Sequence, residues 1–208
     1  MPTDLELLDA WRDGDKSAAD ALIKRHFGPL CRFFRNKVTT GVDDLIQTTL
    51  LTCVERRDRF PEGWSFRTFL FVVARDQLYM QYRKLNRKSI EIDPSVTSIV
   101  DISPSPSAVA AKHDEQRLIL EALRRIPVDL QIALELHYWE GMTGPELARV
   151  LDIPEGTVRS RLRRGRQLFS DKMADLATSA EHLERTLSDL DKWASSVRNV
   201  VGKDLVAE

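Results

Sequence analysis

Five arginines fall within eight residues of the chain, from Arg159 to Arg166, and no acidic residue interrupts them. A guanidinium group can hold a phosphate, or the edge of guanine, through two parallel hydrogen bonds. The whole chain of 208 residues carries a formal net charge of only −1. The cationic cluster is therefore a local feature, and it predicts a contact with nucleic acid that is confined to one element.

The residues before and within this cluster predict two short helices separated by a tight turn. Thr143 and Glu146 have capping-box spacing, which is typical of a helix start. Asp152 tolerates the turn conformation and Pro154 prevents simple continuation of the helix. A second helix is then expected from about Glu155 onward, to residue 169, and the pair has the spacing of a helix-turn-helix.

The expected second helix has one apolar face and one cationic face. Val158 and Leu162 are four residues apart and define the face that packs on the first helix. A solvated charged face would usually have acidic partners at i,i+4, and residues 158–169 contain none. We therefore expect the outer arc to enter the major groove of DNA, with Arg161 on its flank touching phosphate. The candidate contacts are Thr157, Arg159, Ser160, Arg161, Arg163 and Arg164.

Apolar residues recur at intervals of three and four along most of the chain, which predicts an all-α fold with two small helical domains. The first domain is expected over residues 1–88 as a bundle of about four helices, with breaks at Gly14, Gly28–Pro29, Gly41 and Pro61–Gly63. The second is expected over residues 112–171. Residues 89–111 are rich in serine and proline, and we expect a flexible linker that buries too little apolar area to order itself. Residues 172–208 show a seven-residue apolar seam, which predicts an amphipathic C-terminal helix.

Composition excludes several other classes of protein. The longest apolar runs, such as Phe69–Ala74, are too short to span a membrane, and the first residues do not resemble a secretory signal. Cys31 and Cys53 lie among apolar residues and are expected to be buried. The four histidines are scattered, so we expect no metal, no cofactor and no catalytic residue. These features predict a cytoplasmic protein without a membrane partner.

Two segments of the chain resemble domains of one known family. Residues 123–166, from "LRRIPVDLQIAL" to "GTVRSRLRRGR", are similar to the fourth-region domain of bacterial sigma factors of the extracytoplasmic-function (ECF) type, in the sigma-70 family. The stretches "DAWRDGDKSAADALIKRHFGPLCRFF", "DDLIQTTLLTCVERRDRF" and "SFRTFLFVVARDQLYMQYRK" are similar to their second-region domain. The two matches stand in the family's order with a linker between them.

The resemblance implies roles for two groups of residues in the first domain. The helix beginning "DDLIQ" would dock on the clamp of core RNA polymerase, through Asp43, Asp44, Leu45, Gln47 and Thr48. The two acids are equally placed to favour a helix N-terminus. The following helix would melt the minus-ten promoter element and hold its unpaired bases, since aromatic and cationic side chains suit that task. The residues implied there are Phe66, Arg67, Arg75, Asp76, Tyr79, Tyr82 and Arg83.

Some of these residue types also fit a purely structural role. Phe69 and Phe71 are expected in the core, and Tyr79 and Tyr82 fit a core role as well as a strand contact. The sequence departs from the family pattern at Phe69, where tryptophan is usual, and at Asp76, where asparagine is usual. It also has Pro154 where a serine often caps the recognition helix. The acid at position 76 leaves the base preference at the minus-ten element open.

The implied function is that of a transcription initiation factor that binds core RNA polymerase and promoter DNA. Its second domain would recognise the minus-thirty-five element as duplex, and its linker would pass near the RNA exit path. The C-terminal segment is expected to stabilise the second domain or to regulate activity, through contact with the domains or beside an anti-sigma partner. Two alternatives remain: an autonomous regulator that dimerises through its tail, and an enzyme that acts on nucleic acid.

Overall fold

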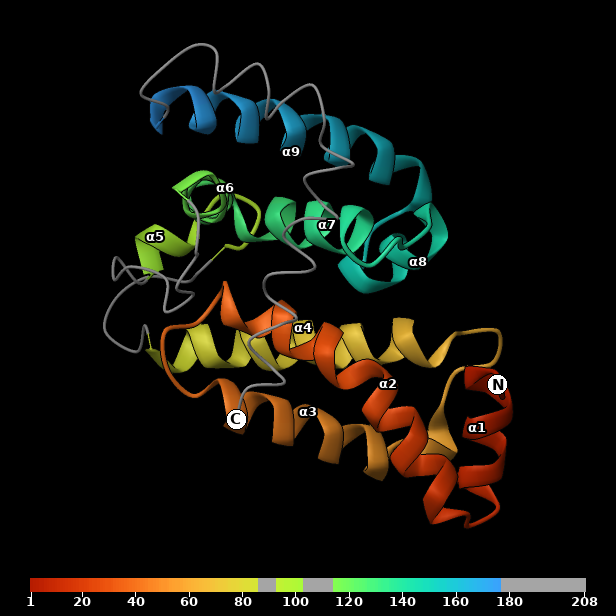
Figure 1. Ribbon diagram of the computed structural model, residues 1–208. Coiled ribbons are helices and arrows are strands. Elements are labelled where there is room, and N and C mark those ends of the chain that lie inside the picture. The colour runs from red at the N-terminus through yellow and green to blue at the C-terminus, as the bar shows by residue number, and fades with distance from the viewer. Residues whose placement is uncertain (86–92, 103–113, 177–208) are drawn as a thin grey trace.

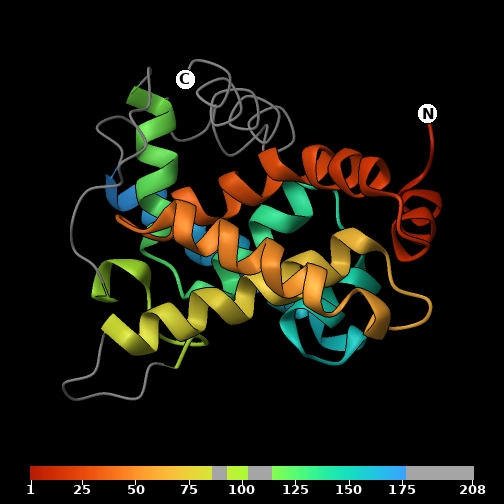
Figure 2. The same cartoon turned by 90° about the horizontal axis from the view of Figure 1, so that it is seen from below.

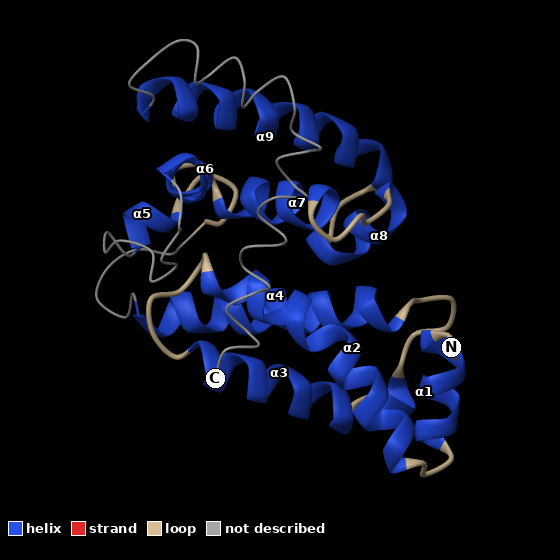
Figure 3. Ribbon diagram, viewed as in Figure 1, coloured by secondary structure: helices blue, strands red, loops and turns tan. Residues whose placement is uncertain are grey.

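The computed structural model describes residues 1–85, 93–102 and 114–176, and this part of the chain is built from helices and loops (Figure 3). The only β-type pairing within it is an isolated bridge between Ser98 and Pro127. The all-α prediction is confirmed. The predicted C-terminal amphipathic helix lies outside the described residues, apart from its first turn.

The first unit is the expected bundle of four α-helices with one 3₁₀ turn. Gly14, Gly41 and Gly63 all adopt positive φ values where the chain turns, a conformation that costs glycine least. The expected break at Gly28–Pro29 is wrong, because a single helix continues through Pro29. That helix buries Leu30, on the C-terminal side of the proline, in the core. The elements are α1 (Asp4–Arg12), α2 (Lys16–Arg35), α3 (Val42–Glu55), η1 (Arg57–Arg59) and α4 (Phe66–Leu85).

The second unit contains the expected helix-turn-helix. Thr143 and Glu146 form a capping box at the start of its first helix. Asp152 ends that helix in the left-handed conformation, with φ of 54°, and the second helix begins directly after Pro154. The helices are α5 (Ile99–Ile102), α6 (Asp114–Arg124), α7 (Val128–Tyr138), α8 (Gly144–Leu151) and α9 (Glu155–Leu176). The last of them continues past the boundary predicted at residue 171.

Apolar packing joins the two units into one body. Buried residues of α2 and α4, such as Phe34 and Phe71, belong to the same continuous cluster as Val128, Leu136 and Leu147 of the second unit. A smaller cluster holds α6 and α9 together around Phe169. A flexible linker suggests two separate domains. In the structure the two units instead pack against each other through a shared apolar core.

Part of the predicted linker is ordered. Ile99 is fully buried. The backbone carbonyls of Thr97 and Pro94 accept hydrogen bonds from the start of α7, where the amide of Val128 donates to Thr97 and that of Asp129 donates to Pro94. The expectation that residues 89–111 bury too little apolar area to become ordered is wrong for residues 93–102. The surfaces of the flanking units supply the apolar area that the segment itself lacks.

The units form stacked layers (Figure 1). Helices α7 and α8 lie between α4 and α9, so that α9 is the outermost helix of the second unit. Helix α3 lies on the opposite side of the molecule, and in the view from below α2, α3 and α4 pass in front of the second unit (Figure 2). The arginine-rich helix and the "DDLIQ" helix thus face in opposite directions.

Both cysteines are buried and free, as expected. Burial raises the pKa of the Cys53 thiol to about 12, and it also raises that of Cys31. Thiols with raised pKa values are poor nucleophiles, so both act as small apolar side chains in the core.

Candidate nucleic-acid interface

Helix α9 presents the cationic surface that its sequence predicts. Val158 is buried and Leu162 packs beside it against the rest of the second unit. Gly165 is also buried, and a Cβ added there would stand 3.3 Å from the side chain of Leu134, so α7 and α9 approach closely at this point. The outer arc is exposed at Arg159, Ser160, Arg163, Arg164 and Arg166.

Two of the predicted α9 contacts are less free than the others. Thr157 is half-buried at the base of the arc. Arg161 points back toward the first turn of α7, where its Nη1 donates to Asp129 at 2.7 Å. A groove along α9 begins at this ion pair and is lined by Thr157, Ser160, Arg161, Arg163 and Arg164 among others. In this structure Arg161 is therefore already paired with Asp129, whereas the other arginines of the outer arc are exposed.

The minus-ten candidates on α4 divide into buried and surface residues. Phe66 packs in the core against Trp11 and His26, and Phe69 and Phe71 are buried as expected. Tyr82 is also buried, and its hydroxyl donates to the carbonyl of Lys37 at 2.8 Å. The rings of Phe66 and Tyr82 are therefore part of the core in this structure. Arg83 is exposed near the end of the helix.

The remaining α4 candidates contact the second unit or one another. Tyr79 donates its hydroxyl to Asp129, and burial, followed by that carboxylate, raises its pKa. Arg75 donates to the carbonyl of Val150, on α8, and pairs with Asp76 at 2.8 Å. The second unit thus covers the face of α4 on which strand contacts are expected.

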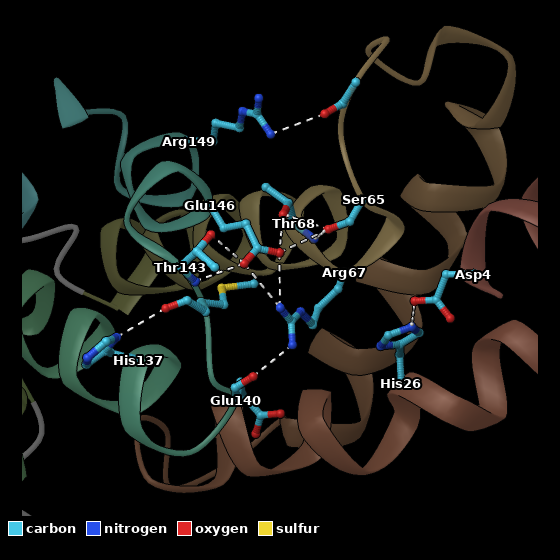
Figure 4. A network of polar contacts seen from close by, with 12 residues as sticks. Asp4, His26, Ser65, Arg67, Thr68, His137, Glu140, Thr143, Glu146 and Arg149 are labelled. Atoms are coloured by element: carbon cyan, nitrogen blue, oxygen red, sulfur yellow. Dashed lines mark hydrogen bonds and ion pairs between the residues drawn. The ribbon is translucent and has the colours of Figure 1, made fainter.

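Arg67 lies at the centre of a polar network between the units (Figure 4). Its guanidinium donates to the carboxylate of Glu146 at 3.0 Å and to the carbonyl of Glu140 at 2.8 Å. The same Glu146 accepts the amide of Thr143 in the capping box. Burial alone would raise the pKa of Glu146, but the Thr143 amide and Arg67 outweigh it and bring that pKa to about 2.

Further contacts extend this interface on both sides. Arg32 of α2 pairs with Glu140 at 2.9 Å, and Arg149 of α8 donates to the carbonyl of Gly63. Lys37 pairs with Glu135 of α7, and both side chains are almost fully buried. Sequence reasoning missed these contacts, because residues about a hundred positions apart leave no local spacing pattern.

Four of the five polymerase candidates on α3 are exposed, and one is not. Asp43, Asp44, Gln47 and Thr48 lie on the surface, whereas Leu45 is buried and serves the core. The exposed stripe continues at Leu51, whose side chain is 55% exposed. Residue 51 follows residues 44, 47 and 48 at helical spacing, so the period of three and four could have identified it from the sequence.

The described part of the chain contains no group of three histidine, cysteine or acidic side chains arranged to hold a metal ion. Over the same residues, no helix combines the length and apolar character needed to cross a membrane. What the geometry offers is cationic and polar surfaces suited to binding.

Comparison with known proteins identifies the class that this pair of units represents. The model of the sigma-70 region 2 family matches residues 22–88, and that of the sigma-70 region 4 family matches residues 116–169. These matches include more than half of the chain, in the order in which the two units occur. The chain therefore belongs to the sigma-70 family, and to its ECF type, which is the type named for the curated relatives that match it.

Relatives of this type resemble the chain along most of its length. The ECF RNA polymerase sigma-E factor of Haemophilus influenzae is 24% identical, covering 84% of this chain and 97% of its own. That of Escherichia coli is 26% identical, covering 84% and 96%.

Two solved structures share the fold. CnrH in complex with the cytosolic domain of CnrY has a TM-score of 0.61 at 23% identity, covering 84% of this chain and 99% of its own. The sigma factor RpoE in complex with the anti-sigma factor NepR, from Bartonella quintana, has a TM-score of 0.58 at 22% identity, covering 74% and 96%.

Proposed function

We propose that this sigma factor binds core RNA polymerase and directs it to promoters by recognising two DNA elements. The observation that carries the proposal is the pairing of the two sigma-70 matches with an exposed arginine face on α9. It acts by binding alone, in the cytoplasm, where polymerase and chromosomal DNA are found. The residues given below are its proposed contacts.

The outer arc of α9 is proposed to read the minus-thirty-five element as duplex. Arg159, Ser160, Arg163 and Arg164 are exposed on a helix with an acid-free central segment, which suits entry into the major groove. Some of these cations would hold phosphates and set the register, and others would reach base edges. Arg161 would join them only after its contact with Asp129 is released.

The α4 surface is proposed to hold the opened minus-ten strand. Arg83 is exposed there, Arg67, Arg75, Asp76 and Tyr79 are half-buried, and Phe66 and Tyr82 support them from the core. Capture of single strands combines cations that follow the backbone with rings on which bases stack. In the compact arrangement described above, this surface faces the second unit.

The exposed stripe of α3 is proposed as the polymerase-binding surface. Asp43, Asp44, Gln47, Thr48 and Leu51 form a polar face with an apolar residue within it, away from the second unit. Residues 89–111 would then pass through the polymerase between the two domains. An anti-sigma partner is also proposed, because a solved structure that shares the fold is a sigma factor in complex with the anti-sigma factor NepR.

Reconstitution with core polymerase tests this function. The chain, mixed with core enzyme and a library of genomic promoter fragments, is expected to yield open complexes at a defined subset of promoters. Absence of any promoter-dependent open complex, also with a chain ending at residue 176, would refute the proposal. An autonomous regulator predicts instead tight duplex binding without polymerase, so the same fragments are tested with the chain alone.

A further inference from the structure

Arg161 differs from the exposed arginines of α9 because a carboxylate of another helix offsets its charge. Its Nη1 donates to Oδ2 of Asp129 at 2.7 Å, and the exposed fractions of the two side chains are 22% and 16%. Arg159, Arg163 and Arg164 are instead exposed on the outer arc. The cationic face of α9 therefore contains both open cations and one that is held by an internal partner.

The position of Asp129 favours this ion pair. The residue stands in the first turn of α7, where a helix N-terminus stabilises a negative charge, and its amide donates to the carbonyl of Pro94 at 3.1 Å. Because the pair is half-buried, salt screens its attraction less than that of an exposed pair. Both partners belong to the second unit, in which α7 and α9 approach closely at Leu134 and Gly165. The pair therefore does not need the first unit.

The ion pair lies at the edge of the groove along α9. Asp129 and Arg161 line this groove together with Thr157, Arg163 and Arg164 among others. Among the described residues that line it, Asp129 is the only acid. A duplex binds such a surface because cations replace the counterions of its phosphates. The carboxylate therefore removes one cation from the set that a DNA backbone could meet.

We propose that Asp129 is a positioning residue that withholds Arg161 from the DNA backbone and so limits how tightly the chain binds duplex DNA of any sequence. This inference rests on the proposed function. Arg161 lies on the flank of α9, where a phosphate contact is expected, and phosphate contacts add affinity without reading sequence. A weaker hold on DNA in general keeps the free chain available to core polymerase, because a chromosome offers a large excess of non-specific sites.

The test frees Arg161 with little change in shape. Asp129→Asn removes the charge of the carboxylate and keeps its size, and Asp129→Ser is the second variant in case the first does not fold. Tyr79→Phe removes the other hydrogen bond of this carboxylate, which comes from α4, and leaves the ion pair in place. Glu155→Gln is the charge-matched control, because it removes an exposed carboxylate at the start of α9.

The first measurement is the affinity of the full-length chain alone for a fluorescent duplex of scrambled sequence, over a range of salt concentrations. Asp129→Asn should bind about tenfold more tightly at about 50 mM salt, with a salt dependence steeper by about one phosphate contact. The control variants should change both quantities much less. An equal gain in Glu155→Gln would reduce the effect to net charge, and an equal gain in Tyr79→Phe would assign it to α4. Either result would overturn the proposal.

A double-mutant cycle then assigns the gain to Arg161. In an Arg161→Gln background, Asp129→Asn should give no further gain, because no cation is left to release. The same comparison is made with Asp129→Ser. A gain that persists without the arginine would overturn the proposal, since the carboxylate would then act on the DNA directly.

Core polymerase tests the proposed function separately. The complex that contains Asp129→Asn should bind promoter fragments and scrambled duplexes more tightly by the same factor, because a phosphate contact carries no sequence information. A gain confined to promoter fragments would place Arg161 on a base edge and would overturn the proposal. If no complex prefers promoters, the proposed function fails, whereas the cycle on scrambled duplex still decides whether Asp129 withholds Arg161.

Discussion

The ammonium group of Lys37 and the carboxylate of Glu135 form an ion pair between the two units at a position that excludes solvent, with exposed side-chain fractions of 0% and 2%. Burial lowers the pKa of Lys37, and Glu135 opposes that shift. Gln131 and Asn36 donate further hydrogen bonds to the same carboxylate. The pair is satisfied only while α2 and α7 stay together.

Replacing Lys37 by methionine should therefore separate the units before it unfolds them. The change leaves a buried carboxylate without its cation, which costs about 3 kcal/mol in comparable pairs, and opening relieves that cost by admitting water. In a urea titration, energy transfer between dyes on Glu55→Cys of α3 and Ala174→Cys of α9, both exposed positions, should fall at lower urea than the helical circular dichroism signal. Lys24→Met, at an exposed lysine of α2, is the control. Coincident transitions in the Lys37 variant would contradict the expectation.

Arg163→Ala and Arg164→Ala should each weaken binding of the polymerase complex to minus-thirty-five duplex by about tenfold, which is within the range for one lost base contact. Both side chains are exposed on the outer arc of α9, so neither change should affect stability. Binding of core polymerase should be unaffected. Arg125→Ala, at an exposed arginine directly after α6, serves as the control. An equal loss in that control would show a general charge effect in place of a specific contact.

Leu51→Glu should weaken binding to core polymerase by more than about tenfold, as loss of an apolar anchor in an interface commonly does. The side chain is 55% exposed on α3, so the folded chain should tolerate the change. Leu5→Glu on α1, where the leucine is 62% exposed, is a matched apolar-to-acidic substitution. The measurement is the affinity of each variant for core polymerase, obtained by titration of labelled chain. Similar losses in both variants would place the polymerase surface elsewhere.

The stabilisation that Glu146 provides should depend on pH only in acid. Its pKa in the folded chain is about 2, below the ordinary value of 4.5, so its contribution is fully present above about pH 4.5 and is lost as the pH falls toward 2. The difference in unfolding free energy between the wild type and Glu146→Gln should be constant near neutral pH and should shrink below about pH 4.5. A difference that persists unchanged to pH 2 would rule out the ionised carboxylate as its source. Glu121→Gln controls for loss of a carboxylate.

A chain that ends at residue 176 should keep the stability of the second unit, whereas one that ends at residue 171 should not. Met173 of α9 is buried in the same cluster as Phe169, and its removal should cost about 2 kcal/mol or more. Urea unfolding compares the two. Promoter-specific transcription by the longer form then isolates any regulatory effect of residues 177–208. Equal destabilisation of both chains would mean that residues 177–208, which both chains lack, stabilise the fold.

Local patterns predicted most of the helices correctly, because caps and turns depend on neighbouring residues. The Thr143–Glu146 capping box, the left-handed turn at Asp152 and the apolar pair Val158 and Leu162 were all readable from spacing. Pro29 misled the prediction, because α2 continues through it and buries Leu30 and Cys31 on its C-terminal side. The ordering of Ile99 was missed because its partners belong to distant segments.

The helical class, the helix-turn-helix and the cationic arc of α9 could be predicted from residue order alone, because periods of three and four and local charge content are properties of contiguous residues. Which side chains are exposed and which have partners depends on how the helices pack. This packing buries Leu45 and Tyr82, and it places Asp129 between Tyr79 and Arg161. These outcomes depend on contacts between segments 30 to 100 residues apart, for which no spacing rule along the chain exists.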